Sequence, residues 1–429
     1  MHRPIFARMP KPYEASLEFA QDMDHADQLF SFRSRFLFPK HEEKDTLYFC
    51  GNSLGLQPRS VRYLMQQELD DWARYGVEGH FEARHPWFSY HQLFAAGLAR
   101  LVGAQKEEVV AMNTLTVNLH LLMASFYRPD KKRYKILMEA GAFPSDQYAM
   151  ETQARFHGLD PEDAIIEIAP KPGSYIIEED DIVAAIEKAG ESLAVVVLGG
   201  VNYYTGQFFD LKTITEAAHR VGAYAGFDLA HAIGNVPLQL HDWDVDFACW
   251  CSYKYLNSGP GGVGGAFINI RHAQNPDIIR LAGWWGNEEQ TRFKMEKGFV
   301  PKPTAESWQM SNAPVFNMVA HYASLDIFDK AGLDKLREKS LELTSYLEFL
   351  LRQIKQLHFT IITPEDPKRR GAQLSLLFHE KGREVFEVLS KAGVIADWRE
   401  PNVIRVAPVP LYNTFEDVYN LYDILNQIA

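Results

Sequence analysis

The sequence predicts an α/β fold, in which a large domain with a mainly parallel, mixed sheet is followed by a small C-terminal α+β domain. Between about residues 105 and 270, short apolar runs alternate with stretches of helical spacing. This alternation is typical of a parallel sheet that helices cover on both faces. After about residue 315 a long amphipathic helix comes first, and short strands and helices follow it. The change of pattern indicates a second, smaller unit.

The predicted strands of the large domain are apolar runs: Tyr134–Glu139, Ala194–Gly200, Tyr224–Leu229, Phe247–Cys251 and Gly265–Ile270. Helical stretches such as Leu211–Val221 lie between them. In sheets of this kind, ligands bind at the carboxyl ends of the strands. We therefore expect the functional side chains at or just after the ends of these runs.

We expect three units along the chain: an N-terminal segment at residues 1–55 that packs with the small domain, the large domain at 56–314, and the small domain at 315–429. Leucines at helical spacing between Leu336 and Leu357 predict a long helix in the small domain. Its further elements are predicted at Phe359–Thr363, Gln373–Phe378, Arg383–Ala392, Val403–Val406 and Thr414–Ile428.

Composition argues against several partners. The net charge of -12 disfavours nucleic acid. The first residues lack the apolar core of a signal peptide, and no run reaches the roughly 18 apolar residues of a membrane span. Three sparse cysteines indicate reduced thiols. We therefore expect a cytoplasmic protein that binds neither nucleic acid nor a membrane.

No metal site is expected. Asp242, Asp244 and Asp246 imitate the start of a calcium loop, but the glycine and the glutamate of such a loop are missing. The histidines in this part of the chain are spaced in a way that neither a helix nor a strand converts into a ligand set; they are His80, His85 and His91.

Asp228 and Lys254 are the most informative pair of residues. Asp228 ends one apolar run, and Lys254 follows the next. A carboxylate buried at the end of a strand is costly unless a cation or hydrogen bonds compensate it. Pyridoxal phosphate supplies such a cation on its ring nitrogen and binds a lysine covalently. A buried ion pair explains the aspartate equally well, so this pair alone leaves both interpretations open.

Further segments bear on this choice. Residues 113–118 place hydroxyl groups before a helix, as either a phosphate site or a plain helix cap does. Phe143 follows a strand and either stacks on a flat ring or fills the core. Trp284 and Trp285 suit a pocket wall or ordinary packing. Arg405, a lone cation in an apolar strand, binds either a substrate carboxylate or a structural one.

Together these segments resemble the kynureninase family, whose members use pyridoxal phosphate and belong to the aspartate-aminotransferase group of folds. The resemblance implies a fold-type I, PLP-dependent transferase-like architecture, and it runs from about residue 48 to the C-terminus. The motifs that carry it are Gly51-Asn52-Ser53-Leu54-Gly55, Phe143-Pro144-Ser145-Asp146, Gly226-Phe227-Asp228-Leu229-Ala230-His231, Trp250-Cys251-Ser252-Tyr253-Lys254-Tyr255-Leu256-Asn257 and Arg405-Val406-Ala407-Pro408-Val409-Pro410-Leu411-Tyr412. Several long motifs together are specific, where a single one is not.

The resemblance implies roles for particular residues, some of them in these motifs and others elsewhere in the chain. Lys254 would bind the cofactor and shuttle a proton, with Tyr253 as general acid–base, while Asp228 would hold the pyridine nitrogen. His231 would lie near the phenolic oxygen, and Phe143 would stack on the ring. Other expected cofactor contacts are Leu115, Thr116, Asp146 and Tyr253 at the phosphate end, Ser145, and Trp284 and Asn312 from a partner chain. Substrate would be bound by Arg405 at the α-carboxylate and by Ser53, His80 and Asn312 at the aryl ketone.

The implied reaction is the hydrolytic cleavage of the Cβ–Cγ bond of L-kynurenine or 3-hydroxy-L-kynurenine to L-alanine and anthranilate or 3-hydroxyanthranilate. It would serve tryptophan catabolism and NAD biosynthesis. His80, Ser311 and Asn312 are similar to family members that prefer the 3-hydroxy substrate. A homodimer is expected, because sites in this group of folds usually lie between subunits. Gly199 departs from the pattern, since relatives often carry serine there, so one hydroxyl contact near the cofactor is absent.

Rival functions share this fold. A cysteine desulfurase needs a nucleophilic cysteine on a loop after the lysine, and no cysteine follows Cys251. A class V aminotransferase is the better enzymatic alternative and would form pyridoxamine phosphate with a 2-oxo acid. A non-catalytic binding protein of the same fold is a third possibility. The joint presence of Lys254, Asp228, Tyr253 and Arg405 argues against it.

Overall fold

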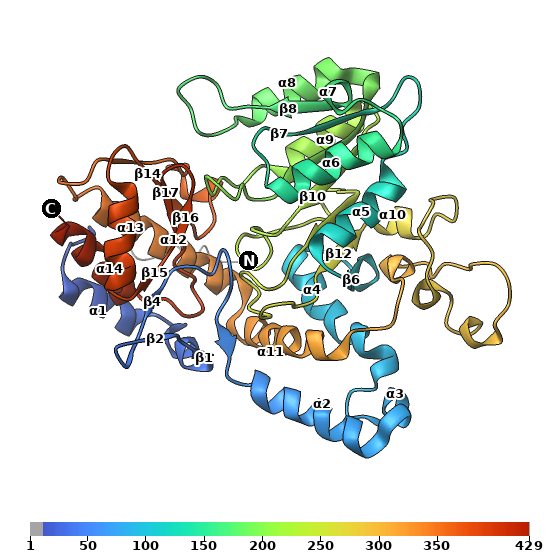
Figure 1. The fold of residues 1–429 in the computed structure, drawn as a ribbon, viewed down its shortest axis with the longest axis horizontal. Coiled ribbons are helices and arrows are strands. Elements are labelled where there is room, and N and C mark those ends of the chain that lie inside the picture. Colours follow the sequence, from blue (N-terminus) through green and yellow to red (C-terminus); the bar gives the residue numbers. More distant parts are fainter. Residues whose placement is uncertain (1–11, 429) are drawn as a thin grey trace, which may run out of the picture.

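The large domain is built on a seven-stranded sheet with the strand order β6-β12-β11-β10-β9-β7-β8 (Figure 1). The computed structural model describes residues 12–428. Strands β7 to β11 are parallel to one another, and β12 is antiparallel to both of its neighbours. This confirms the predicted mainly parallel, mixed sheet. The strands are β6 (Val109–Ala111), β7 (Lys135–Glu139), β8 (Ile165–Ile168), β9 (Leu193–Gly199), β10 (Tyr224–Asp228), β11 (Phe247–Trp250) and β12 (Gly265–Ile268).

Helices cover the two faces of this sheet with separate apolar cores. Alternate side chains of a strand enter different cores: Leu137 and Phe227 belong to one, and Ile136 and Phe247 belong to the other. The first core also contains side chains of α4 (Ala95–Val102), α8 (Glu179–Ala189), α9 (Leu211–Arg220) and α11 (Val315–Ala331). The second contains side chains of α5 (Leu115–Phe126) and α6 (Pro144–Phe156). Both faces are therefore dry, as a parallel sheet requires.

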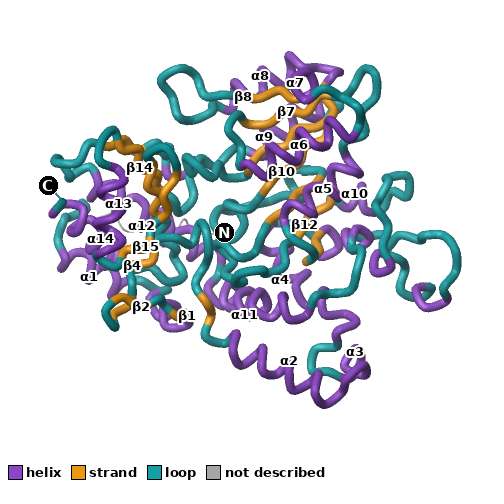
Figure 2. The backbone as a smooth tube through the Cα atoms, in the orientation of Figure 1, coloured by secondary structure: helices purple, strands orange, loops and turns teal. Residues whose placement is uncertain are grey.

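Shorter elements complete the large domain. Helix α2 (Val61–Tyr75) packs against α11, and α3 (Gly79–Glu82) follows it at the edge of the molecule (Figure 2). The remaining short elements of this domain are β5 (Gln57–Pro58), α7 (Pro161–Ala164) and α10 (Ile270–Ala273), whereas the short strands β1 (Phe36–Leu37), β2 (Lys40–His41) and β3 (Lys44–Asp45) belong to the N-terminal segment.

The small domain is a four-stranded antiparallel sheet covered by helices, with the strand order β13-β14-β17-β16. A single core joins the sheet to α12 and α14. Its elements are α12 (Leu333–Leu351), β13 (Phe359–Ile361), β14 (Leu374–Phe378), α13 (Gly382–Lys391), β15 (Val394–Ile395), β16 (Asp397–Arg399), β17 (Val403–Val406) and α14 (Phe415–Gln427).

Of the predicted N-terminal segment, residues 1–11 lie outside the described residues, and the part from residue 12 onward has elements that pack against the small domain. Helix α1 (Leu17–Ala26) packs on α14, and strand β4 (Leu47–Tyr48) pairs with β15. The carboxylate of Asp24 accepts the backbone N–H groups of Phe415 at 2.7 Å and Glu416 at 3.0 Å, which caps the start of α14.

The packing of α11 differs from the predicted division at residue 315. Helix α11 contacts α2 and α4, which belong to the large domain, whereas α12 contacts α14. The change from one unit to the other therefore lies at Gly332, between α11 and α12. The apolar pattern of α11 gives no hint of this, because a helix that packs on either unit shows the same buried positions.

Among residues 12–428, no helix is long and apolar enough to cross a membrane. Within the same residues, histidine, cysteine, aspartate and glutamate form no group of three or more that could hold a metal ion.

Candidate active site

A cavity opens at the carboxyl ends of the parallel strands, where Asp228 ends β10 and Lys254 follows β11. Most predicted cofactor residues converge there, although their segments lie far apart in the sequence. The strands and helices that bring them together all begin or end at this edge of the sheet, as expected for an open α/β sheet. The lining residues are Leu115, Thr116, Glu139, Phe143, Ser145, Asp146, Gly199, Val201, Tyr203, Asp228, Ala230, His231, Tyr253 and Lys254.

Lys254 points at His231 across the cavity. Its Nζ lies 3.0 Å from the Nε2 of His231 and 5.7 Å from the centre of the Phe143 ring. Burial lowers the pKa of His231 well below its usual value, and the charges of Lys254, Arg405 and Arg399 lower it further. The imidazole is therefore neutral and accepts a hydrogen bond from the lysine. The geometry joins a tethering amine, a neutral imidazole and an aromatic ring in one small space.

Three buried carboxyl groups meet beside the lysine, namely Glu139, Asp146 and Asp228. Burial raises the pKa of Asp228, an effect that Lys254 opposes. Burial raises the pKa of Asp146 well above its usual value, and the negative charge of the adjacent Asp228 raises it further. Burial raises the pKa of Glu139 to about 7, and the charge of Asp228 adds to the rise. Such a cluster calls for a further cation.

The contacts of Asp146 indicate a different position from the predicted one. The sequence placed it at the phosphate end of the cofactor, whereas its carboxyl lies against Asp228 at the end expected for the pyridine nitrogen. Asp146 sits in the first turn of α6, after a helix start fixed by Pro144. That turn aims the carboxyl across the sheet edge toward β10 rather than toward the start of α5.

The start of α5 faces the same cavity through Leu115 and Thr116. Among residues 12–428, no group of this helix donates to the side chain of Thr114 at the N-cap position. The plain helix cap that the sequence also allowed is therefore not formed. The first N–H groups of α5 and its positive dipole end remain available for an anion such as a phosphate.

The turn Gly51–Gly55 closes over the lysine loop. The N–H of Gly55 donates to the carbonyl of Tyr253 at 2.8 Å. A Cβ at Gly55 would lie 2.4 Å from the carbonyl oxygen of Lys254, so only glycine permits this approach. Ser53 lies in this turn and is thereby held near the lysine loop. Burial raises the pKa of Tyr253 above its usual value, so its hydroxyl keeps its proton.

Arg405 lies in β17 and is fully buried. Its Nη1 donates to the carbonyl of Tyr203 at 2.5 Å, and Tyr203 lines the cavity of the lysine. Its Nη2 forms an ion pair with Asp397 of β16. The structural interpretation therefore applies, because the guanidinium has a carboxylate partner, and its contact with Tyr203 places it at the edge of the site.

The residues of this cavity fit pyridoxal phosphate. Oδ1 of Asp146 is buried and has no hydrogen-bond partner among residues 12–428, and the same holds for Nδ1 of His231. A protonated pyridine ring supplies the cation that Asp146 and Asp228 lack. Lys254 is placed to bind its aldehyde, Phe143 to cover the ring, and the start of α5 to bind the phosphate.

His80 and Asn312 lie in a different cavity. They line it together with Glu68, Trp72, Trp87, Ala313, Val315 and Phe316. Among the described residues, this cavity and that of Lys254 have no lining residue in common. Trp284 is half exposed, and its Nε1 donates to the carbonyl of Arg292 at 3.0 Å. Within one chain, His80 and Asn312 therefore lie apart from the cavity of Lys254, and Trp284 is not among the residues that line that cavity.

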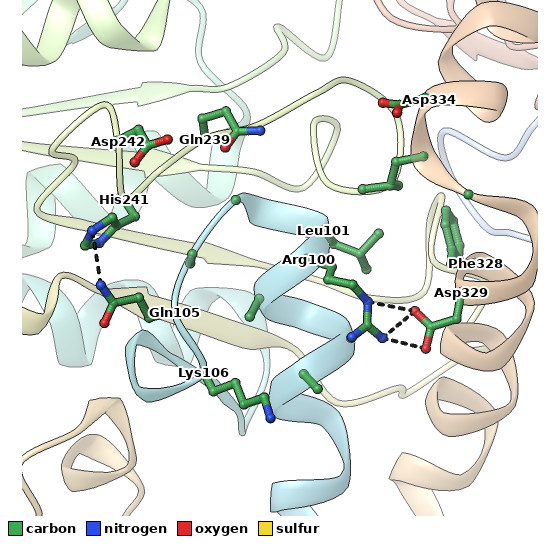
Figure 3. A pocket seen from close by; sticks show the side chains of 17 residues that line it. Arg100, Leu101, Gln105, Lys106, Gln239, His241, Asp242, Phe328, Asp329 and Asp334 are labelled. Carbon is green, nitrogen blue, oxygen red and sulfur yellow. Dashed lines mark hydrogen bonds and ion pairs between the residues drawn. The ribbon is translucent and has the colours of Figure 1, made fainter. Parts of the chain in front are cut away.

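A larger groove lies between α4, residues 239–242 and the end of α11 (Figure 3). Two of its lining pairs are in contact: Nη2 of Arg100 donates to both carboxylate oxygens of Asp329, at 2.6 and 2.7 Å. Nε2 of Gln105 lies 3.1 Å from Nε2 of His241. Because none of the predicted cofactor residues lines this groove, we place the active site at the smaller cavity of Lys254.

Several residues of the site escaped the sequence analysis. Glu139 ends β7 as Asp228 ends β10, so the signal used for the aspartate was also present for the glutamate. The N–H of Gly199 donates to Oε1 of Glu139 at 3.1 Å. Asp397 gave no signal, because its contact with Arg405 depends on the pairing of two short strands.

The chain is similar to many curated proteins over nearly its full length. It is 53% identical over 418 residues to a kynureninase of Flavobacterium psychrophilum, with 97% of this chain and 98% of the relative covered. It is 53% identical to a kynureninase of Myxococcus xanthus, with the same coverage. A kynureninase of Xanthomonas campestris pv. campestris is 54% identical, with 95% of this chain and 97% of the relative covered. A family model, the kynureninase C-terminal domain, matches residues 336–425.

Solved structures share the fold at low sequence identity. A cysteine desulfurase CsdA from Escherichia coli has a TM-score of 0.75 at 18% identity, with 93% of this chain and 98% of that chain covered. A C-DES mutant with glycine covalently linked to its PLP cofactor has a TM-score of 0.75 at 16% identity, with coverage of 90% and 97%. These likenesses confirm the predicted fold class. The curated relatives confirm the predicted enzyme class, a pyridoxal-phosphate-dependent hydrolase acting on carbon–carbon bonds. The chain belongs to the kynureninase family.

Proposed function

We propose that the protein hydrolyses the Cβ–Cγ bond of L-kynurenine and of 3-hydroxy-L-kynurenine, with preference for the 3-hydroxy form. The products are L-alanine and anthranilate or 3-hydroxyanthranilate. The observation that carries the proposal is the meeting of Lys254, Asp228 and Phe143 in one cavity of a chain more than half identical to kynureninases.

When bound, pyridoxal phosphate supplies an electron sink that stabilises negative charge at the carbon atoms of the amino acid. Lys254 would hold the aldehyde carbon of the cofactor, and its amine would take the proton from the substrate Cα. Asp228, with Asp146 beside it, would keep the proton on the ring nitrogen. His231 stays neutral and orients the amine of Lys254. Tyr253, which retains its proton, acts as the general acid.

The α-carboxylate of the substrate binds Arg405, because a buried guanidinium presents a rigid fork of donors to a carboxylate. Leu115, Thr116 and Ser145 bind at the phosphate end of the cofactor. Ser53 faces the ketone from the turn over the lysine loop.

We further propose a homodimer in which His80, Asn312 and Trp284 come from the partner chain. The support is their separation from Lys254 within one chain and their common location, since His80 and Asn312 line one cavity. Large apolar side chains are exposed around them: Trp72 is 57% exposed, Phe81 59% and Val77 72%. An apolar surface of this kind marks an interface. The partner's aromatic cavity then receives the aryl group.

The family also supports a cytoplasmic location and a role in tryptophan catabolism and NAD biosynthesis. The cysteines agree with that location, because Cys50, Cys249 and Cys251 are all free thiols in the structure.

The proposed reaction is tested with the purified, cofactor-loaded protein and 3-hydroxy-L-kynurenine. We expect L-alanine and 3-hydroxyanthranilate in equal amounts, with no requirement for a 2-oxo acid. A faster reaction with plain L-kynurenine would contradict the proposed preference. Turnover that needs a 2-oxo acid would favour the aminotransferase. A protein that stays colourless with added cofactor would favour a binding protein.

A further inference from the structure

Two arginines of the small domain share one carboxylate. Strands β16 and β17 are antiparallel with Asp397 directly opposite Arg405, and Arg399 lies two residues further along the same face. Oδ2 of Asp397 accepts from Nη2 of Arg405 and, at 3.1 Å, from Nη2 of Arg399. A single oxygen atom of one aspartate therefore bridges both guanidinium groups.

This cluster has a net charge of one positive unit, because two guanidinium groups share one carboxylate. The side chain of Arg405 is buried, at 1% exposed, and that of Arg399 is partly buried, at 35% exposed. Among residues 12–428, Nε of Arg405 and Nε of Arg399 have no hydrogen-bond partner. A buried cation with unused donors is costly unless an anion meets it. The cluster is thus built to accept one more anion.

The unused charge faces the active site. Tyr203, whose carbonyl binds Arg405, lines the cavity of Lys254. Both arginines act electrostatically on His231, which contacts Lys254. Asp397, Arg405 and Arg399 also act electrostatically on the thiol of Cys50, which lies at the start of the turn over the lysine loop. The anion that completes the cluster therefore comes from the cavity, where the substrate lies.

We propose that Arg399 is a positioning residue. It keeps its ion pair with Asp397 when an α-carboxylate displaces Asp397 from Arg405. In the ligand-free protein Asp397 holds both arginines. An incoming carboxylate replaces Asp397 on Nη2 of Arg405, and Asp397 stays neutralised because its bond to Arg399 remains. Without Arg399, the ligand would have to leave a buried aspartate unpaired. This inference rests on the proposed role of Arg405.

The test uses the cofactor-loaded protein and two probes, L-alanine and L-alaninamide, which differ only in the carboxylate. Their binding constants are measured from the visible spectrum of the bound cofactor. Arg399→Gln is expected to weaken the binding of L-alanine by about tenfold and the binding of L-alaninamide by less than about twofold. Asp397→Asn is expected to tighten L-alanine, because the ligand no longer competes with an anion. Arg399→Lys keeps the charge and is expected to retain most of the L-alanine affinity.

Two further variants separate the possible failures. Arg405→Gln is expected to give L-alanine and L-alaninamide similar binding constants. If their binding constants still differ as in the unmodified protein, the proposed role of Arg405 is wrong. If Arg405→Gln removes this difference but Arg399→Gln weakens both probes equally or neither, only the role of Arg399 is wrong. Arg383→Gln removes an exposed arginine of the same domain, which lies 3.6 Å from Glu387, and serves as the matched control. It is expected to bind both probes as the unmodified protein does.

Discussion

The cavity of Lys254 and the cavity of His80 and Asn312 differ in how they are built. The first lies at the strand ends and is lined by almost completely buried carboxyl groups, a buried imidazole and the partly buried Lys254. The second lies between α2, α3 and the start of α11, and its walls are mainly aromatic and partly exposed. A single chain thus brings together the groups that we propose perform the chemistry. The aromatic walls of the second cavity remain partly exposed to solvent.

This difference separates two tasks. Charged groups that bind a cofactor and move protons need a rigid, dry site, which the edge of a parallel sheet provides within one chain. Recognition of an aryl group needs apolar area and a few hydrogen bonds, which a second copy can supply. In the proposed dimer, the exposed side chains around His80, such as Trp72 and Phe81, would be covered by the partner chain.

The largest effect is expected for Lys254→Ala. Without the amine, neither the cofactor bond nor the proton transfer at the substrate Cα is available, so kcat should fall by at least about 10⁴-fold. The spectrum of the bound cofactor should change as well. Lys132→Ala, an exposed lysine paired with Glu191, is the control and should leave both unchanged. Full turnover in Lys254→Ala would refute the assigned role of the first cavity.

Asp228→Asn tests the electrostatic part of the same cavity. The amide keeps the shape but cannot hold a proton on the ring nitrogen, so kcat should fall by about 10²–10³-fold while cofactor is still bound. Steady-state kinetics and cofactor titration measure the two quantities. A variant with turnover within about threefold of the unmodified protein would show that the carboxyl cluster does not serve the reaction.

His80→Ala and Asn312→Ala test the second cavity. If these side chains hydrogen-bond the 3-hydroxyl group, each change should lower the ratio of kcat/KM for the 3-hydroxy over the plain substrate by about tenfold. Binding of L-alanine, which lacks the aryl group, should stay the same. His25→Ala, on the exposed face of α1, is a suitable control. An unchanged substrate ratio in both variants would place aryl recognition elsewhere.

Glu139→Gln gives the smallest effect, on stability. The pKa of Glu139 is raised from 4.5 to about 7 in the folded chain, so the folded state holds a proton that the unfolded state has lost between these values. Stability therefore falls as pH rises through this window, and the loss persists at higher pH. A glutamine at this position does not ionise, so the variant does not lose stability in this way. The cofactor-free variant should be about 1–3 kcal/mol more stable than the unmodified chain at pH 8 and nearly equal at pH 4. Equal melting temperatures at both pH values would contradict the shift.

The sequence contained enough to predict the apolar strands and the polar residues that end them. β10 and β11 were expected within one residue of their observed ends, because Tyr224–Asp228 and Phe247–Trp250 are apolar runs bounded by polar turns. β6 and β8 were missed, since Val109–Ala111 has only three residues and Ile165–Ile168 is interrupted by Glu167. Short strands gain their stability from pairing, which periodicity does not show.

Contacts between distant segments were beyond the sequence. The sharing of Asp397 by two arginines depends on the register of β16 and β17. The common cavity of His80 and Asn312 depends on the packing of α11 against α2, which no local pattern encodes. Even the resemblance to a family assigned Asp146 to the phosphate end, because it supplied a role without a geometry.

A hybrid dimer tests the division between the two cavities most directly. One chain carries Lys254→Ala and the other carries both His80→Ala and Asn312→Ala, with different tags so that the hybrid is purified alone. If each site combines Lys254 of one chain with His80 and Asn312 of the other, the hybrid keeps one intact site, and its turnover of 3-hydroxy-L-kynurenine exceeds that of both parent dimers. A hybrid of His80→Ala with Asn312→Ala has no intact site and should show no such recovery. A purified hybrid of the first kind that is no more active than its parents would contradict the account.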